Sequence, residues 1–169
     1  MLSNYALGLL NLALFLWNLS AAAIVLCLKS SELLKSPADE KQATEAARRS
    51  ESISLTLGGF TLAALAVVIA FRESLAGFEF SIFFLSFSFT MFIISVVFFA
   101  NRTRIIWKEL GGIAQDYGLL LLVAGLIALL DAVNLLTSLT VTPPVILGIF
   151  VMSWQVVDIV MIHRKNMKR

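Results

Sequence analysis

The chain has 169 residues, of which 59% are hydrophobic and 14% are charged, and its mean hydropathy is +0.92. This composition excludes a soluble globular domain and is typical of a polytopic membrane protein, whose first partner is the lipid bilayer. A net charge of +2 argues against a nucleic-acid partner, and one cysteine with one histidine excludes a disulfide framework and a Cys- or His-based metal site.

Five apolar segments are long enough to cross a bilayer, which takes about 20 residues of α-helix. They cover residues 4–28, 53–71, 80–100, 117–139 and 145–162. We therefore expect an all-α protein with a single membrane domain over residues 1–169 and five transmembrane helices.

Basic residues are distributed unevenly between the two sides of these spans. Twelve of the 13 follow span one, follow span three or lie in the C-terminal tail, and only Arg72 lies on the opposite side. Because cytoplasmic loops carry the excess of Lys and Arg, we expect the N-terminus outside and the C-terminus inside. The expected location is the plasma membrane.

The first span carries three asparagines at intervals of seven residues, which places them on one helix face. They are Asn4, Asn11 and Asn18. Since an asparagine is unfavourable against hydrocarbon, we expect this face to contact other helices of the protein.

The second span is predicted to begin in water, as a cytoplasmic helical extension over residues 36–52. Ser36 is a capping residue, Pro37 follows at the first helical position, and Asp39 and Glu40 lie in the first turn. Good helix formers continue without a break, so we expect one long helix that ends across the membrane.

One face of this long helix carries small residues at alternating steps of four and three, with a cation at its inner end and an anion at its outer end. These residues are Arg49, Ser52, Thr56, Gly59, Ala63, Ala66, Ala70 and Glu73. Such a stripe either lets another helix approach closely or borders a narrow pore.

The third span repeats a small polar residue every seven positions, at Ser81, Ser88 and Ser95, among many phenylalanines. We expect this seam to pack against a neighbouring helix. A short connection should bring Glu79 near Glu73, which predicts an acidic cluster at the outer surface.

The segments around the last two spans are assigned to the interface and to a loop. Residues 102–116 are predicted to form a short interfacial helix that ends at Gly111 and Gly112. Residues 141–144, which include Pro143 and Pro144, are predicted to connect spans four and five.

Spans four and five contain four costly polar residues: Asp131, Asn134, Gln155 and Asp158. Each aspartate costs about 2.5–3.5 kcal/mol to insert, so each should face the protein interior or water. The two aspartates differ in depth by about 10 Å, and the glutamine falls between them. We expect an intramembrane polar ladder, which is either a structural network or a route for a cation or proton.

Motifs for nucleotide binding, nucleophilic catalysis and redox chemistry are absent from the sequence, so we expect no enzyme and no cofactor. Five spans leave little protein to enclose a pathway, so a homo-oligomer that shares one face around an axis is expected. If the small-residue stripe lines that axis, the chain is the pore-forming subunit of a small channel for inorganic ions, with cations favoured by the outer glutamates.

Residues 54–60 (Ser-Leu-Thr-Leu-Gly-Gly-Phe) look like the pore helix of the Orai calcium channels, which is also extended into the cytoplasm, basic inside and acidic at its outer mouth. The resemblance covers about 20 residues, and this chain has an additional span in front, so it serves as an analogy. The alternatives are a small cation or proton transporter that uses Asp131 and Asp158, and a non-transporting scaffold or signalling subunit. The stripe could also pack within one subunit.

Overall fold

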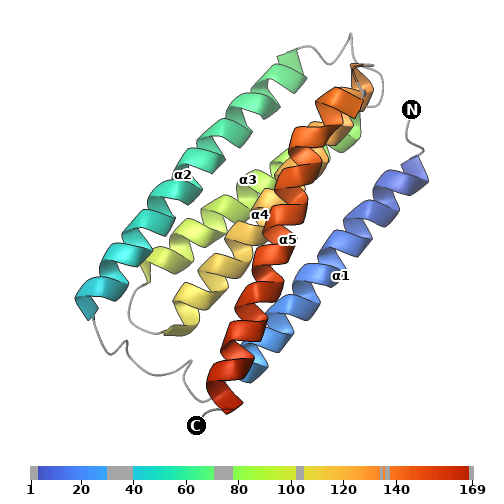
Figure 1. Cartoon of the computed structure of the whole chain (residues 1–169). Coiled ribbons are helices and arrows are strands. Elements are labelled where there is room, and N and C mark those ends of the chain that lie inside the picture. Colours follow the sequence, from blue (N-terminus) through green and yellow to red (C-terminus); the bar gives the residue numbers. More distant parts are fainter. Residues whose placement is uncertain are drawn as a thin grey trace.

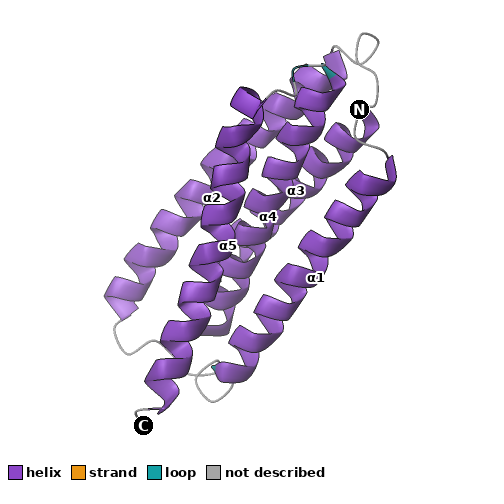
Figure 2. Cartoon of the chain, turned by 45° about the vertical axis from the view of Figure 1, so that its right-hand side comes forward, coloured by secondary structure: helices purple, strands orange, loops and turns teal. Residues whose placement is uncertain are grey.

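Each of the apolar segments folds as an α-helix, and the helices lie side by side as an elongated bundle (Figures 1 and 2). The computed structural model describes residues 4–29, 40–70, 78–101, 105–133, 135 and 138–167. Its helices are α1 (Asn4–Leu28), α2 (Glu40–Ala70), α3 (Phe78–Ala100), α4 (Ile105–Ala132) and α5 (Ser138–Met167). The all-helical fold class is confirmed.

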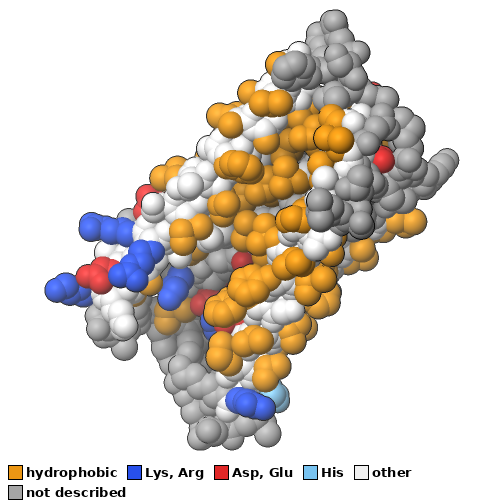
Figure 3. Space-filling model, turned by 45° about the horizontal axis from the view of Figure 1, so that its top comes forward, with side chains coloured by type: hydrophobic (Ala, Val, Ile, Leu, Met, Phe, Trp, Pro, Cys, Tyr) orange, Lys and Arg blue, Asp and Glu red, His pale blue; other side chains and the backbone are white. Residues whose placement is uncertain are grey.

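Four of the helices are long and apolar enough to cross a membrane. These are α2, α3, α4 and α5, and α1 contributes a shorter apolar stretch, Leu12–Leu28. Hydrophobic side chains cover the middle of the molecule in Figure 3, and the Lys and Arg side chains of this face gather at one end. The protein is therefore built as a membrane protein.

The predicted unbroken helix through the second span is confirmed from Glu40 to Ala70. Two other boundaries were wrong. Gly111 and Gly112 do not end a short helix, because α4 continues through both of them as far as Ala132. The prolines 143 and 144 lie inside α5, which begins at Ser138, instead of in a connecting loop.

The centre of the bundle is the antiparallel pair α3 and α4. Glycines at intervals of seven residues on α4 face large side chains at intervals of seven residues on α3. Gly111 lies against Phe99, and Gly118 lies against Phe92. A Cβ added at either glycine would come within 2.9 Å of the facing ring. One step further along, Gly125 lies against Leu85 in the same way. The glycines therefore allow the two helices to approach each other closely.

The serine seam of α3 lies in this same interface, as expected. Ser81, Ser88 and Ser95 are fully buried. Ser88 Oγ donates to the carbonyl oxygen of Gly118 at 2.7 Å, and Ser95 Oγ donates to that of Gly111 at 2.9 Å. These bonds can form because the glycines bring the two backbones together.

Helix α3 also packs against α2, which uses a different heptad from the predicted stripe. Four buried residues of α2 recur every seven positions, namely Ala47, Ser54, Thr61 and Val68, and Gly58 is buried between them. Ser54 Oγ lies 3.0 Å from Ser95 Oγ, so the two helices share a buried hydrogen bond. Thus α2 attaches to α3 by one face and leaves its small-residue face outward.

Helix α1 lies on the far side of the bundle from α2, against α4 and α5 (Figures 1 and 2). Asn18 of this helix is 5% exposed, so the expectation that its face contacts protein is met there. The side chains of Asn4 and Asn11 lie outside the described residues.

Candidate functional site

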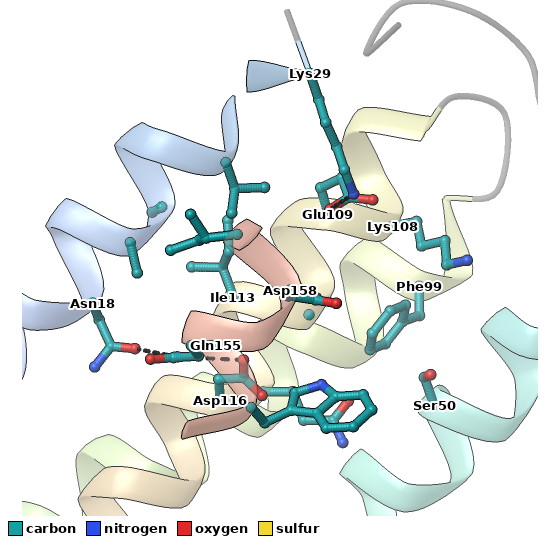
Figure 4. A pocket seen from close by; sticks show the side chains of 17 residues that line it. Asn18, Lys29, Ser50, Phe99, Lys108, Glu109, Ile113, Asp116, Gln155 and Asp158 are labelled. Carbon is teal, nitrogen blue, oxygen red and sulfur yellow. Dashed lines mark hydrogen bonds and ion pairs between the residues drawn. The ribbon is translucent and has the colours of Figure 1, made fainter. Parts of the chain in front are cut away.

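A polar cavity of about 520 Å³ opens among α1, α4 and α5, near the end of the bundle where the basic residues gather (Figure 4). Ser50 of α2 and Phe99 of α3 complete its wall. Its polar lining consists of Asn18, Lys29, Ser50, Lys108, Glu109, Gln115, Asp116, Gln155 and Asp158. So many polar groups between apolar helices are costly unless they are paired or functional.

Gln155 of α5 is the centre of the hydrogen-bond network in this cavity. Its Oε1 accepts from the indole nitrogen of Trp17 at 2.6 Å. Its Nε2 donates to Asn18 Oδ1 at 3.1 Å and to Asp116 Oδ2 at 3.3 Å. The amide is 8% exposed and joins α1, α4 and α5 by its side chain alone.

Asn18 extends the network into the backbone of α1. Its Nδ2 donates to the carbonyl oxygen of Leu14 at 2.8 Å, which leaves Oδ1 free to accept from Gln155. Both amide orientations are therefore fixed by their partners. A fixed amide positions the carboxylate it binds, here Asp116, at the cavity wall.

Two aspartates, Asp116 of α4 and Asp158 of α5, face this cavity and lie close enough to interact electrostatically (Figure 4). With Asn18, they lie nine to 11 residues from this end of their helices. At about 1.5 Å per residue, the polar layer lies about 15 Å from the ends of these helices. A pair of carboxyl groups at that depth attracts cations.

An ion pair forms part of the cavity lining. Lys29 Nζ, directly after α1, lies 2.7 Å from Glu109 Oε2 of α4, and the two side chains are 22% and 18% exposed. This pair neutralises one charge of each sign. The ammonium group of Lys108 points away from the two aspartates in Figure 4, so the interior of the cavity keeps its negative character.

The remaining wall is apolar and aromatic. Trp154 of α5 lines the cavity and is 53% exposed, and Val25, Ile113 and Ile159 line it as well. Within the described residues no three His, Cys, Asp or Glu side chains are grouped to hold a metal ion. The cavity therefore combines two carboxylates with apolar walls, which suits an organic or weakly hydrated cation.

The predicted polar ladder is not assembled as expected. Gln155 and Asp158 do line one cavity, but their partner on α4 is Asp116. Asp131 is 15 residues further along α4, about 22 Å away, because α4 and α5 meet at a different register from the one assumed. The side chain of Asn134 lies outside the described residues.

Sequence analysis missed Asp116 because it was placed in an interfacial segment. Once α4 is read as one helix, Glu109, Gly112 and Asp116 follow at steps of three and four, which puts them on one face. That spacing was the available signal. The pairing of Asp116 with Asn18 and Gln155 left no signal in the sequence, because Asn18 and Gln155 are 137 residues apart.

The small-residue stripe of α2 faces away from the bundle. Its described members are all exposed: Arg49, Ser52, Thr56, Gly59, Ala63, Ala66 and Ala70. Nothing lies within 4 Å of a Cβ added at Gly59. Glu79 is exposed at the start of α3. Glu73 lies outside the described residues, so the predicted acidic cluster of the two glutamates lies outside them as well.

Comparison of the chain with known protein families, with curated proteins and with solved structures found no match.

Proposed function

We propose that the protein is a transporter of small cations, and that the cavity at Asp116 and Asp158 is its cytoplasmic binding site. The proposal places five spans in the cell membrane, with the N-terminus outside and the C-terminus inside. The 25-residue length of α1 supports the fifth span. The basic residues at the cavity end of the helices support the orientation.

The observation that carries the proposal is the pair of aspartates in a cavity enclosed by apolar helices. Ionisable residues inside membrane proteins are rare and mark ion or substrate pathways. A purely structural network would need only the amides, because Gln155 and Asn18 already connect α1 with α5. Asp158 is exposed to the cavity, which favours a role in binding.

The test is cation flux into liposomes that contain the purified protein, measured for Na⁺, K⁺ and methylammonium with and without a proton gradient. Asp116→Asn and Asp158→Asn should each lower the flux at least 10-fold. The matched control is Glu45→Gln on the exposed cytoplasmic part of α2, which should stay within twofold of the unmodified protein.

Asparagine has the size of aspartate, so both variants should fold, and an unchanged elution profile and melting temperature check this. Unchanged flux in the variant that carries both substitutions would refute the proposal. Flux that depends on Glu45 equally would also refute it, since that carboxylate lies outside the cavity.

A second candidate is the pore of a homo-oligomeric, cation-conducting channel lined by the stripe of α2. It is favoured because the stripe is exposed on the single chain while a different face of α2 packs on α3. A second copy could therefore approach this face, as expected for an oligomer around a shared axis.

The channel is tested with single cysteines in a chain that lacks Cys27. Cysteines at Thr56 and Ala63 should react with water-borne thiol reagents. The control is a cysteine at Leu55, which is 51% exposed but off the stripe and should be shielded by lipid. Equal reactivity at all three positions, or a monomer by native mass measurement, would contradict the pore.

A further inference from the structure

We propose that the cavity binds a small organic cation, a compound with a substituted ammonium group. Asp116 and Asp158 would attract its positive charge, and the indole of Trp154 would contact its carbon substituents. This inference rests on the proposed transport function and specifies the class of substrate.

The volume of the cavity is the first reason. At about 520 Å³ it lies within the range of about 300–1,000 Å³ that small-molecule sites occupy. A dehydrated metal ion instead needs several oxygen ligands within about 2.3–2.6 Å, as in calcium sites. No such group of acidic ligands exists among the described residues. The space therefore fits a molecule better than a bare ion.

The depth of the charges is the second reason. Asp116 and Asp158 lie about 15 Å from the ends of their helices, and Asp116 is partly buried, so a cation that binds between them must lose part of its water. That loss is large for a compact, strongly hydrated ion and smaller for a charge spread over a larger group. A substituted ammonium ion therefore loses less hydration free energy when it binds to the same pair of carboxylates.

The walls are the third reason, because they offer apolar contact beside the charge. Trp154 presents an exposed aromatic ring, and the face of an indole attracts ammonium groups within about 6 Å. Ala22 of α1, Ile113 of α4 and Ile159 of α5 supply aliphatic surface. N-alkyl groups would be removed from water by these side chains, whereas an inorganic ion has no carbon substituents to bury there.

The experiment compares choline with 3,3-dimethyl-1-butanol, an uncharged molecule of the same shape, by isothermal titration into the full chain in lipid discs of phosphatidylglycerol. Choline should bind at least 10-fold more tightly than the alcohol and more tightly than Na⁺ at equal ionic strength. Equal binding of choline and the alcohol, or of choline and Na⁺, would overturn the inference.

Variants locate the binding. Asp158→Asn should weaken choline binding at least 10-fold, and Trp154→Leu should weaken it about fivefold. The control is Trp107→Phe, because Trp107 stacks on Phe98 outside the cavity, and it should stay within twofold. Unchanged choline binding in Trp154→Leu would overturn the role of the aromatic wall.

The source of the ammonium group is decided by repeating the titration in phosphatidylcholine discs. If soluble choline no longer competes there, a lipid headgroup occupies the cavity, and if its Kd is unchanged, the ligand is a free amine. Choline binding that fails while Na⁺ or K⁺ flux still depends on Asp116 and Asp158 would refute this inference and leave the transport proposal standing.

Discussion

Replacing Gly118 by alanine tests the close packing that positions the cavity. Gly118 lies two residues after Asp116 on α4, at a close approach to α3. A Cβ at this position would lie 2.9 Å from Cε1 and 3.1 Å from Cδ1 of Phe92. The Phe92 side chain is fully buried, and a Cβ added at Gly58 of α2 would lie 3.6 Å from the Cβ of Phe92, so this side chain is packed between α2 and α4 and has little room to retreat.

The magnitude follows from two opposing effects. Alanine favours the helix over glycine by about 1 kcal/mol. Overpacking a close-packed site costs about 1–3 kcal/mol, and separation of the helices also weakens the bond from Ser88 Oγ to the Gly118 oxygen, worth about 1 kcal/mol. We expect Gly118→Ala to lower the free energy of unfolding by about 1–2 kcal/mol.

The matched control is Gly59→Ala on the exposed stripe of α2, where an added Cβ meets nothing within 4 Å. Only the helix preference acts there, so this variant should gain up to about 1 kcal/mol. The free energy of unfolding is measured by titrating dodecyl sulfate into mild micelles and following helix content. If Gly118→Ala is as stable as Gly59→Ala, the α3–α4 interface is not packed as described.

Three further predictions use the same preparations. Ser95→Ala removes one buried hydrogen bond to α2 and one to α4, so it should cost about 1–2 kcal/mol of unfolding free energy. Thr90→Ala, which is exposed and bonded within its own helix, should cost less than about 0.5 kcal/mol, and equal losses in the two variants would contradict the seam. Gln155→Leu leaves three polar partners without a hydrogen bond, so it should lower the free energy of unfolding by about 1–3 kcal/mol. It should also make α1 more sensitive to protease. An unchanged cleavage rate would show that the amide does not hold α1. Lys29→Met breaks the partly exposed pair with Glu109, so stability should change by less than about 1 kcal/mol while cation flux into liposomes rises severalfold; unchanged flux would show that this pair does not restrict entry.

Much of the fold follows from local features of the sequence. The helices could be predicted from the apolar segments, because length and hydropathy are properties of each segment alone. The serines of α3 indicated a packed face for the same reason, since a step of seven residues returns to one side of a helix whatever its neighbour is. The start of α4 was misplaced, because Gly111 and Gly112 favour a helix terminus locally, whereas the packing of Gly111 against Phe99 keeps this segment in the helix.

The candidate site was predicted less completely than the fold. Gln155 and Asp158 were selected because polar residues are costly in a span, and both do line the cavity. The wrong partner, Asp131, was chosen because the relative register of α4 and α5 was estimated by counting residues from assumed helix ends. Those ends were displaced by several residues, and one helical turn of error moves a side chain by about 5.4 Å.

The sequence by itself determined that this protein consists of apolar helices with its basic residues concentrated in a few segments between and after the spans. Only the tertiary structure decided that Asp116 meets Gln155 and that the small stripe of α2 faces outward. The physical reason is that hydropathy and charge act on each segment separately. Register and neighbours depend on how glycines and large side chains of different helices fit together, and that fit sums contacts between residues far apart in the chain.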